Sequence, residues 1–425
     1  MNVGTRSGVA RALRRLRTVI FWLHLTAGLS AAAIILTMSV TGVLLTYQRQ
    51  IQAWADTRGL DAGPPAVTDA TDETTGAPTP LSPEALLERV AATHPGTVTS
   101  VRWSRDPAAP VEVALGRDVT LFVNGYTGSV LGDGSERTRA FFRTVLDWHR
   151  WLGLKEDLRP RGRAVTGAAN LLFLFIVIAG VYLWWPRNVT RRSFRSVLVF
   201  RTGLRGKARD FNWHNVIGIW SVVPLIIVIA SGVVISYAIA SAAVARLAGW
   251  DAPAAMMAPA PTAGPSAAVT ARSSPDRQPV PPADMAPADT MAPQAFLLGR
   301  ARAQMPDWRW VTVRLPVRDG RVVYTLDGGY PGQPQKRAQV TLSAATGDVV
   351  SWDPFSSQAR AQRVRSILRY AHTGEVLGLA GQTVAGIVSA AAVVLVWTGV
   401  ALALRRFGAW RRRRRRGGRA APAVR

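Results

Sequence analysis

Four long apolar stretches constrain this chain more than any other feature of its sequence. Each is long enough to cross a bilayer core of ~30 Å, which needs about 20 residues of helix. None of them carries an acidic or basic residue in its middle. They predict a membrane protein with four spanning helices rather than two or three soluble domains. The stretches are Val19–Tyr47, Ala164–Trp185, Val216–Ala240 and Thr383–Leu404.

The net charge of +26 is concentrated around these stretches. Arg and Lys crowd residues 6–17, 187–209 and 405–425, whereas the two long segments between stretches mix both signs. This positive-inside pattern predicts an inner-membrane protein with both termini and the short middle segment in the cytoplasm. The arginine run of the tail could touch RNA. We expect it instead to anchor the topology beside anionic lipid, with the bilayer and not nucleic acid as its partner.

The chain contains no cysteine. Disulfides, zinc–thiolate sites, iron–sulfur clusters and covalent c-type haem attachment are therefore excluded. A redox centre in this protein would have to be held by His, Met, Tyr or carboxylate groups.

The sequence also reads as a duplicated unit. Both long segments begin with an amphipathic helix, near Ser82 and near Ala292, and continue into alternating strands with a Thr-Gly turn at Thr127 and Thr346. Ser82 is a good N-cap for the first of these helices. The first and third apolar stretches align as His-x3-Gly-x13-Gly-Val, through His24, Gly28 and Gly42 and through His214, Gly218 and Gly232.

The predicted fold is therefore an all-α four-helix membrane bundle with two extracytoplasmic α+β modules. The expected order is a basic cytoplasmic N-terminus (1–18), helix one (19–47), an outer module (48–148) with a linker at 61–80, helix two with a preceding interfacial segment (149–186), a basic cytoplasmic loop (187–213), helix three (214–240), a second outer module (241–371) with a disordered linker at 250–293, helix four with a preceding interfacial segment (372–404), and an arginine-rich cytoplasmic tail (405–425).

Four of the five histidines lie at or near the ends of the predicted helices. His24 and His214 are expected at the cytoplasmic side, and His149 and His372 at the outer side. A single interfacial histidine is usually structural, but bis-imidazole ligation of haem needs one histidine from each of two facing helices. The duplicated spacing favours two b-type haems, with His24 and His214 as axial ligands of one and His149 and His372 of the other. His94 is interpreted as a surface or capping residue.

Glycines accompany these histidines at helical spacing. Gly28 and Gly218 lie one turn from His24 and His214 on the same face, where a missing side chain would let a flat porphyrin approach. Gly42 and Gly232 lie 18 residues beyond His24 and His214, which is five helical turns and roughly 27 Å deeper, near the second haem. Small residues also promote close helix packing without any cofactor, and the glycines alone do not separate the two interpretations.

Other side chains leave alternatives open. The tryptophans at span ends read mainly as an interfacial belt, although Trp148 and Trp213 could pack on a haem edge. Arginines flanking the outer histidines could pair with haem propionates or a ferric chelate, or simply form a solvated helix face; these are Arg143, Arg150, Arg365 and Arg369. Methionines in the second linker could bind Cu(I), but their irregular spacing favours chance composition; these are Met256, Met257, Met285 and Met291.

Taken in order, several motifs of this chain resemble the PepSY-associated transmembrane family, iron-regulated inner-membrane proteins that include ferric-siderophore reductases. They are "LHLTAGL" at His24, "LDWHRWLGL" at His149, "NWHNVIGIW" at His214, "YAHTGEVLGLAGQ" at His372, and the "NGYTGSVLG" and "SAATGDVVSWDP" turns of the two PepSY-like outer modules. The resemblance covers nearly the whole chain apart from the linkers and the tail, and the outer histidine pair depends on it more than the inner pair does.

The resemblance implies a reductase that passes electrons across the membrane to an extracytoplasmic ferric siderophore for iron acquisition. An electron would enter at His24/His214, move to His149/His372 and leave to a substrate near the PepSY-like modules. No nucleotide or flavin motif is present, so the electron donor would be external. Two alternatives stay open: a cupric or other metal reductase with the same haems, and a non-enzymatic regulatory envelope protein.

Overall fold

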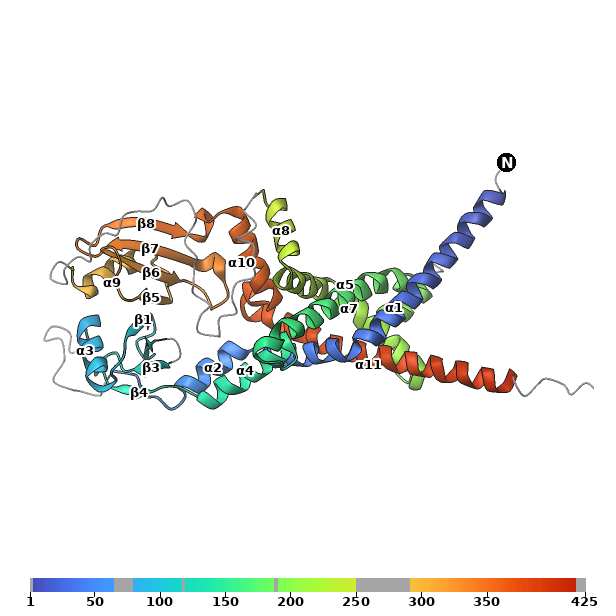
Figure 1. Cartoon of the computed structure of the whole chain (residues 1–425), viewed down its shortest axis with the longest axis horizontal. Helices are drawn as coiled ribbons and strands as arrows, with labels where there is room; N and C mark the ends of the chain where they lie inside the picture. The colour runs from blue at the N-terminus through green and yellow to red at the C-terminus, as the bar shows by residue number, and fades with distance from the viewer. Residues whose placement is uncertain (1–2, 65–78, 117–118, 187–189, 250–290, 418–425) are drawn as a thin grey trace, which may run out of the picture.

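The computed structural model describes residues 3–64, 79–116, 119–186, 190–249 and 291–417. These residues form a bundle of long helices with a β-sheet beyond one of its ends (Figure 1). The N-terminus and the end of the last helix lie at the opposite end of the bundle, together with the arginine clusters. The two ends of the bundle are called below the sheet end and the arginine-rich end.

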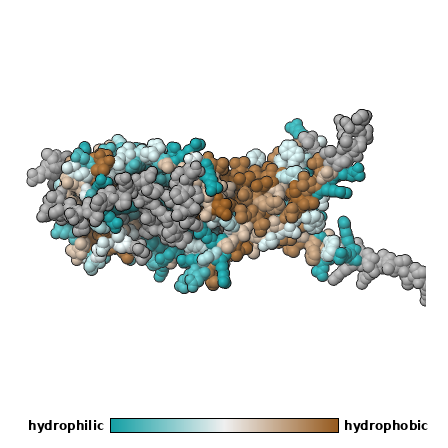
Figure 2. Space-filling model, turned by 45° about the horizontal axis from the view of Figure 1, so that its top comes forward, coloured by the Kyte–Doolittle hydropathy of each residue, from teal (hydrophilic) through white to brown (hydrophobic). Residues whose placement is uncertain are grey.

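In the described part, four helices are long and apolar enough to cross a membrane. Apolar side chains cover the outside of the bundle as a broad belt (Figure 2), as expected for helices whose surroundings are lipid. The predicted four-helix membrane protein is thus confirmed. The helices are α1 (Val3–Leu45), α5 (Arg159–Trp184), α7 (Gly206–Ser236) and α11 (Gly378–Gly417).

The four long helices pack in a ring. Helix α1 contacts α5 and α11, and α7 contacts the same two helices, so α1 and α7 face each other diagonally. Shorter helices occupy the two ends of the bundle or lie on the sheet: α2 (Gln48–Thr57), α3 (Pro83–Thr93), α4 (Glu136–Trp151), α6 (Arg191–Leu198), α8 (Ala238–Leu247), α9 (Gln294–Ala303) and α10 (Arg360–His372), with 3₁₀ turns η1 (Glu156–Leu158), η5 (Pro334–Lys336), η6 (Phe355–Ser357) and η7 (Glu375–Leu377).

Sharp turns connect α4 to α5 and α10 to α11, so that α4 packs against α1 and α5 and α10 packs against α7. A Cβ atom added to Gly162 of α5 would lie within 3.0 Å of the Trp151 carbonyl oxygen, and one added to Gly381 of α11 would lie equally close to the Gly374 carbonyl oxygen. Only glycine lets these backbones approach so closely. The turns bring the C-terminal ends of α4 and α10, which carry His149 and His372, against the bundle.

The sheet has eight antiparallel strands in the order β4-β3-β2-β1-β5-β6-β7-β8. Helices α3 and α9 contact each other and cover one face, where they enclose a core of Val and Leu from the strands with Leu86, Val90, Leu297 and Leu298. The strands are β1 (Val98–Ser104), β2 (Val111–Leu115), β3 (Val119–Val123), β4 (Val130–Gly132), β5 (Trp310–Arg314), β6 (Arg321–Asp327), β7 (Arg337–Ser343) and β8 (Val349–Pro354).

The two halves of the sheet do not form the separate modules that the sequence analysis describes. Strand β1 pairs with β5, with Val101 opposite Val313 and Trp103 opposite Val311, and one continuous core runs beneath both halves. Alone, each half would expose β1 or β5 as an unpaired edge with a buried apolar face, and their pairing removes both edges. The predicted linkers at 61–80 and 250–293 fall largely on residues 65–78 and 250–290, outside the described residues.

Candidate paired-histidine site

His149 and His372 meet at the sheet end of the bundle. His149 is near the C-terminal end of α4 and His372 ends α10, and their ring centres lie 6.3 Å apart with the ring planes tilted by 58°. The two rings come from opposite corners of the bundle, because α4 packs on α1 and α10 packs on α7. The structure therefore brings together the two residues that the sequence paired.

The hydrogen bond of His149 fixes which ring nitrogen carries a proton. Its Nδ1 lies 2.9 Å from the Thr41 hydroxyl, and that hydroxyl donates its own proton to the Thr37 carbonyl oxygen at 2.6 Å. Nδ1–H must then be the donor to Thr41 Oγ1, which leaves the Nε2 lone pair free. This is the tautomer that a metal-binding histidine uses when a neighbouring residue orients its ring.

His372 has the same tautomer. Its Nδ1 lies 2.8 Å from the Val228 carbonyl oxygen, which can only accept a hydrogen bond, and 3.4 Å from the Ser231 hydroxyl. Nδ1 is therefore protonated, and Nε2 is the nitrogen left to bind a ligand.

Burial favours the neutral form of both rings. Burial lowers the pKa of His149 to about 4, with a smaller effect from the nearby His372, and burial likewise lowers the pKa of His372. A neutral imidazole is the form that coordinates a metal.

The second pair lies at the arginine-rich end. His24 lies on α1 and His214 on α7, the helices that face each other diagonally across the bundle. His214 Nδ1 lies 2.9 Å from the Thr398 hydroxyl, which donates to the Val394 carbonyl oxygen at 2.8 Å, so this ring also carries its proton on Nδ1. His24 Nδ1, in contrast, is buried and has no hydrogen-bond partner within the described part of the chain.

Each histidine lies against a glycine of a neighbouring spanning helix. A Cβ atom at Gly42 would lie 3.7 Å from His149, at Gly232 3.1 Å from His372, at Gly180 3.4 Å from His24 and at Gly399 3.4 Å from His214. The other two predicted glycines contact no histidine: a Cβ at Gly28 would meet nothing within 4 Å, and one at Gly218 would meet Leu395. The suggestion that Gly28 and Gly218 admit a porphyrin stays a prediction.

All four glycines belong to the same short pattern, a small residue followed by Gly and Val. The tripeptides are Thr41-Gly42-Val43, Ala179-Gly180-Val181, Ser231-Gly232-Val233 and Thr398-Gly399-Val400. Of these positions, only Gly42 and Gly232 were predicted from the sequence. The repeated pattern marks the hydroxyl residues Thr41, Ser231 and Thr398, but it does not show which side chains they contact. Along α1, His24 and Gly42 are 18 residues apart, which places the two histidine pairs about 27 Å apart.

Three arginines gather beside the sheet-end pair. Burial lowers the pKa of Arg150, and the nearby Arg369 and Arg163 lower it further. No carboxylate forms an ion pair with any of the three within the described residues. Arg163, which no sequence motif marks, also donates to the Ile235 and Ser236 carbonyl oxygens at 3.2 Å. This cluster can bind an anionic group.

The other two predicted arginines lie apart from this cluster. Arg143 pairs with Glu136 at the far end of α4. Arg365 is exposed on α10, one turn before Arg369. Of the predicted anion contacts, the structure therefore brings together Arg150 and Arg369.

A buried carboxylate fixes each end of the bundle. At the sheet end, Glu375 pairs with Arg49 at 2.8 Å and accepts a hydrogen bond from Thr373 at 3.0 Å. At the arginine-rich end, Asp210 is 1% exposed and pairs with Arg209 at 2.9 Å and Arg405 at 2.7 Å. Asp210 lies one helical turn before His214 and joins α7 to α11 there.

The remaining predicted groups lie away from the histidine pairs. Trp148 packs on Gly153, and the Trp213 ring lies under the Arg209 guanidinium. His94 caps the C-terminal end of α3, in agreement with its interpretation as a capping residue. Met291 packs against the core under the sheet. The three other linker methionines, Met256, Met257 and Met285, lie outside the described residues.

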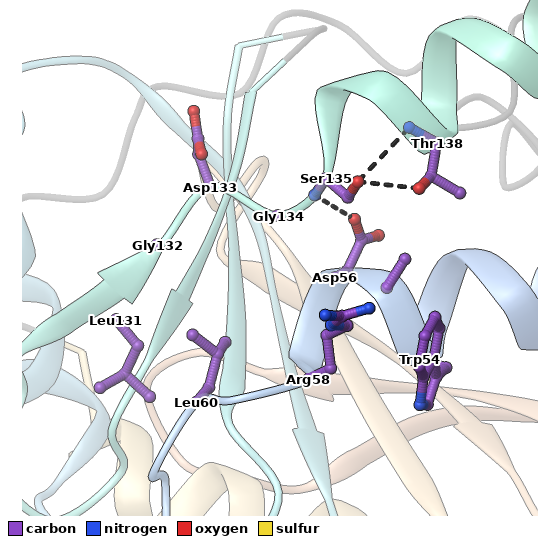
Figure 3. Close-up of a pocket in the computed structure, with 11 residues that line it drawn as sticks. Trp54, Asp56, Arg58, Leu60, Leu131, Gly132, Asp133, Gly134, Ser135 and Thr138 are labelled. Carbon is purple, nitrogen blue, oxygen red and sulfur yellow. Dashed lines mark hydrogen bonds between the residues drawn. The ribbon is translucent and has the colours of Figure 1, made fainter.

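A separate cavity of about 440 Å³ lies between α2 and the start of α4 (Figure 3). Asp56 projects into it and accepts hydrogen bonds from the Ser135 backbone at 2.6 Å and from Arg139 at 3.0 Å. Its walls carry both charges, from Asp56, Arg58 and Asp133. His149 lies 13 residues along α4 from Glu136, about 20 Å away, so the cavity and the histidine pair do not share a ligand.

The fold and the site define a class of protein: a four-helix membrane protein with one histidine pair near each end of its bundle and an antiparallel sheet beyond one end. The chain belongs to the PepSY-associated transmembrane family, because the model of the PepSY-associated TM region matches residues 21–406. A search of curated proteins found no match.

Proposed function

We propose that the two histidine pairs hold two b-type haems. The observation that carries this proposal is the 6.3 Å between the His149 and His372 ring centres. An imidazole nitrogen binds a first-row metal at about 2 Å, and each ring centre lies about 1 Å further away, so an iron held between two imidazoles requires ring centres about 6 Å apart. A tilt between the ring planes is compatible with this geometry, because each ring can turn about its bond to the iron.

The set of donors also fits haem better than a bare metal ion. A metal held by protein side chains alone usually takes at least three of them, and no cluster of three or more His, Cys, Asp or Glu suited to a metal occurs in the described residues. A porphyrin supplies four of the six ligands of its iron and needs only two imidazoles from the protein. His149, His372 and His214 present Nε2 for this role, with Nδ1 held by Thr41, by Val228 and by Thr398.

The test is a reduced-minus-oxidised absorption spectrum of the purified protein with a haem-to-protein ratio. We expect a b-type spectrum and two haems per chain. His149→Ala or His372→Ala should remove one haem, His24→Ala or His214→Ala the other, and the His94→Ala control should keep both. Protein without a haem spectrum would contradict the proposal and favour a regulatory envelope protein.

The proposed function is electron transfer across the membrane to an extracytoplasmic ferric siderophore. Bound haem would supply one-electron chemistry, and the protein would set its axial ligands and position. The charge distribution supports the orientation: the arginine-rich end, with both termini, would face the cytoplasm of the inner membrane, and the sheet would face outward. Arg150 and Arg369 would bind the propionates of the sheet-end haem or the anionic chelate, and the donor would be an external reductant.

The acceptor can be identified with the reduced protein. Mixing it with a ferric siderophore should reoxidise the haem spectrum much faster than mixing it with a cupric chelate of similar charge. Faster reoxidation by the cupric chelate would instead favour the copper-reductase alternative. An Arg150→Gln variant should slow reoxidation by an anionic chelate more than reoxidation by a neutral one, if the arginine contacts the substrate.

Internal duplication of the chain is also a proposal, and the sheet supports it. Each half contributes a helix and four strands, and the halves meet at β1 and β5. In that pairing Val101 faces Val313 and Trp103 faces Val311. When the two halves are aligned 210 positions apart, Val101 corresponds to Val311 and Trp103 to Val313. Each residue therefore pairs with the counterpart of the other, as expected for two equivalent units related by a twofold axis between Arg102 and Thr312.

A further inference from the structure

One of the four histidines lacks a contact that the other three have. The residue before the contacting glycine has a hydroxyl on three helices, at Thr41, Ser231 and Thr398, and each hydroxyl lies within hydrogen-bond distance of a histidine Nδ1. On α5 the same position is Ala179, next to Gly180, which His24 contacts.

The consequence is an unpaired polar atom inside the bundle. His24 Nδ1 is buried and has no hydrogen-bond partner within the described part of the structure. The Ile176 carbonyl, one turn before Ala179, faces the same ring but lies outside hydrogen-bond geometry. At the sheet end, the corresponding carbonyl of Val228 does accept from His372 at 2.8 Å. On α5, therefore, no hydroxyl fixes the tautomer and rotation of His24, and the Ile176 carbonyl faces the ring without completing a hydrogen bond.

We infer that Ala179 makes His24 the exchangeable axial ligand of the pair at the arginine-rich end. This inference rests on the proposed haem ligation and adds to it a difference between the two centres. A hydrogen bond to the second ring nitrogen orients a metal-bound histidine and makes it a stronger ligand, and its loss typically weakens binding about 10–100-fold. His214, held by Thr398, is the fixed ligand of the same centre, and both ligands of the sheet-end centre are fixed.

The exchange would admit small neutral ligands of ferrous iron, of which carbon monoxide is the simplest probe. With haem bound, CO would replace the His24 imidazole through its carbon lone pair, with no change in the oxidation state of the iron. Ala179 itself is 6% exposed and carries no group that can bind iron, so it would act through His24 as a positioning residue.

The experiment is CO binding to the dithionite-reduced, purified protein, followed by absorption spectroscopy. In the natural protein we expect CO to bind half of the haem, at the His24/His214 centre. Ala179→Thr supplies the missing hydroxyl and should reduce CO affinity about tenfold. Ala179→Val has the same shape without the acceptor and should bind CO like the natural protein. Ala179→Ser offers a smaller acceptor if threonine does not fit.

The midpoint potential gives a second measurement that altered packing alone would not reproduce. A hydrogen-bonded imidazole donates more strongly and favours the ferric state, so a tenfold change in that preference lowers the potential of one centre by about 59 mV. We expect this shift for Ala179→Thr and not for Ala179→Val.

The outcomes separate the inference from the proposed function. Protein without haem would overturn both. Haem-loaded protein that binds CO at neither centre, or at both alike, would overturn only the inference. Equal behaviour of the threonine and valine variants would overturn it as well.

Discussion

At the scale of single residues, the informative contacts are the hydrogen bonds of the imidazole Nδ1 atoms. In His149, His372 and His214 an acceptor on the neighbouring helix holds the Nδ1 proton, and this determines that Nε2 is available. A histidine kept for packing alone would not need the same nitrogen protonated in three separate places. The repeated choice of tautomer supports a shared ligand-binding role.

Thr41 provides a direct test of this contact. Thr41→Val removes the acceptor of the buried His149 Nδ1–H, whereas Thr41→Ser retains it. Leaving a buried donor unpaired costs about 1–3 kcal/mol. The Met38 carbonyl also faces the His149 ring, so we expect a loss near 1 kcal/mol. Thermal unfolding of the protein without haem should show a lower midpoint for valine than for serine; equal midpoints would contradict the assignment of the proton.

The histidine pairs could be predicted from the sequence, but the side chains that contact them could not. The five histidines are few enough to pair by position, and helical spacing places Gly42 and Gly232 deep in their helices. The contacts of Thr41, Thr398 and Arg163 could not be derived in this way. They depend on the rotation of each helix about its axis, which packing between helices determines, and apolar stretches in a membrane leave that rotation undefined.

At the scale of elements, the hairpins between α4 and α5 and between α10 and α11 place the sheet-end pair. His149 and His372 precede the spanning helices in sequence, and from spacing alone His149 was expected outside the apolar region. The turn closed by Gly162 brings α4 back against α1, so His149 reaches Gly42. Sequence patterns predict that a turn exists, but the angle at which its two helices meet depends on tertiary contacts.

Gly162→Ala should displace α4. The added Cβ would overlap the Trp151 carbonyl oxygen, and backbone atoms cannot move aside without shifting the helix. We expect loss of the haem at His149/His372 with retention of the other, seen as a haem-to-protein ratio that falls from two towards one. Gly299→Ala on α9 is a matched control, because a Cβ there meets nothing within 4 Å. Retention of two haems in Gly162→Ala would show that the hairpin does not position His149.

At the scale of the whole molecule, the sheet joins the two halves of the chain beyond the membrane. Helices α1 and α5 flank one half of the sheet in sequence and α7 and α11 flank the other, so pairing of β1 with β5 couples the two sides of the bundle that supply the members of each histidine pair. The alternating strands were predictable from period-two patterns. The pairing of β1 with β5 was not predictable. An edge strand that pairs with a strand of another module has the same sequence pattern as an edge strand covered by a helix.

A cysteine pair can test this joining, since the natural chain has no cysteine. Arg102 and Thr312 are direct partners in the β1–β5 register, and directly opposite residues of antiparallel strands have Cα atoms about 4.5–5.5 Å apart, within the range of a disulfide. With a protease site inserted between residues 250 and 290, oxidised Arg102→Cys/Thr312→Cys protein should migrate as one species after cleavage and as two after reduction. The Ser104→Cys/Arg314→Cys control, four positions out of register, should give two species under both conditions. If the control cross-links as well as the paired variant, the two halves are not held in a fixed register, and the sheet cannot hold the two sides of the bundle in one fixed arrangement.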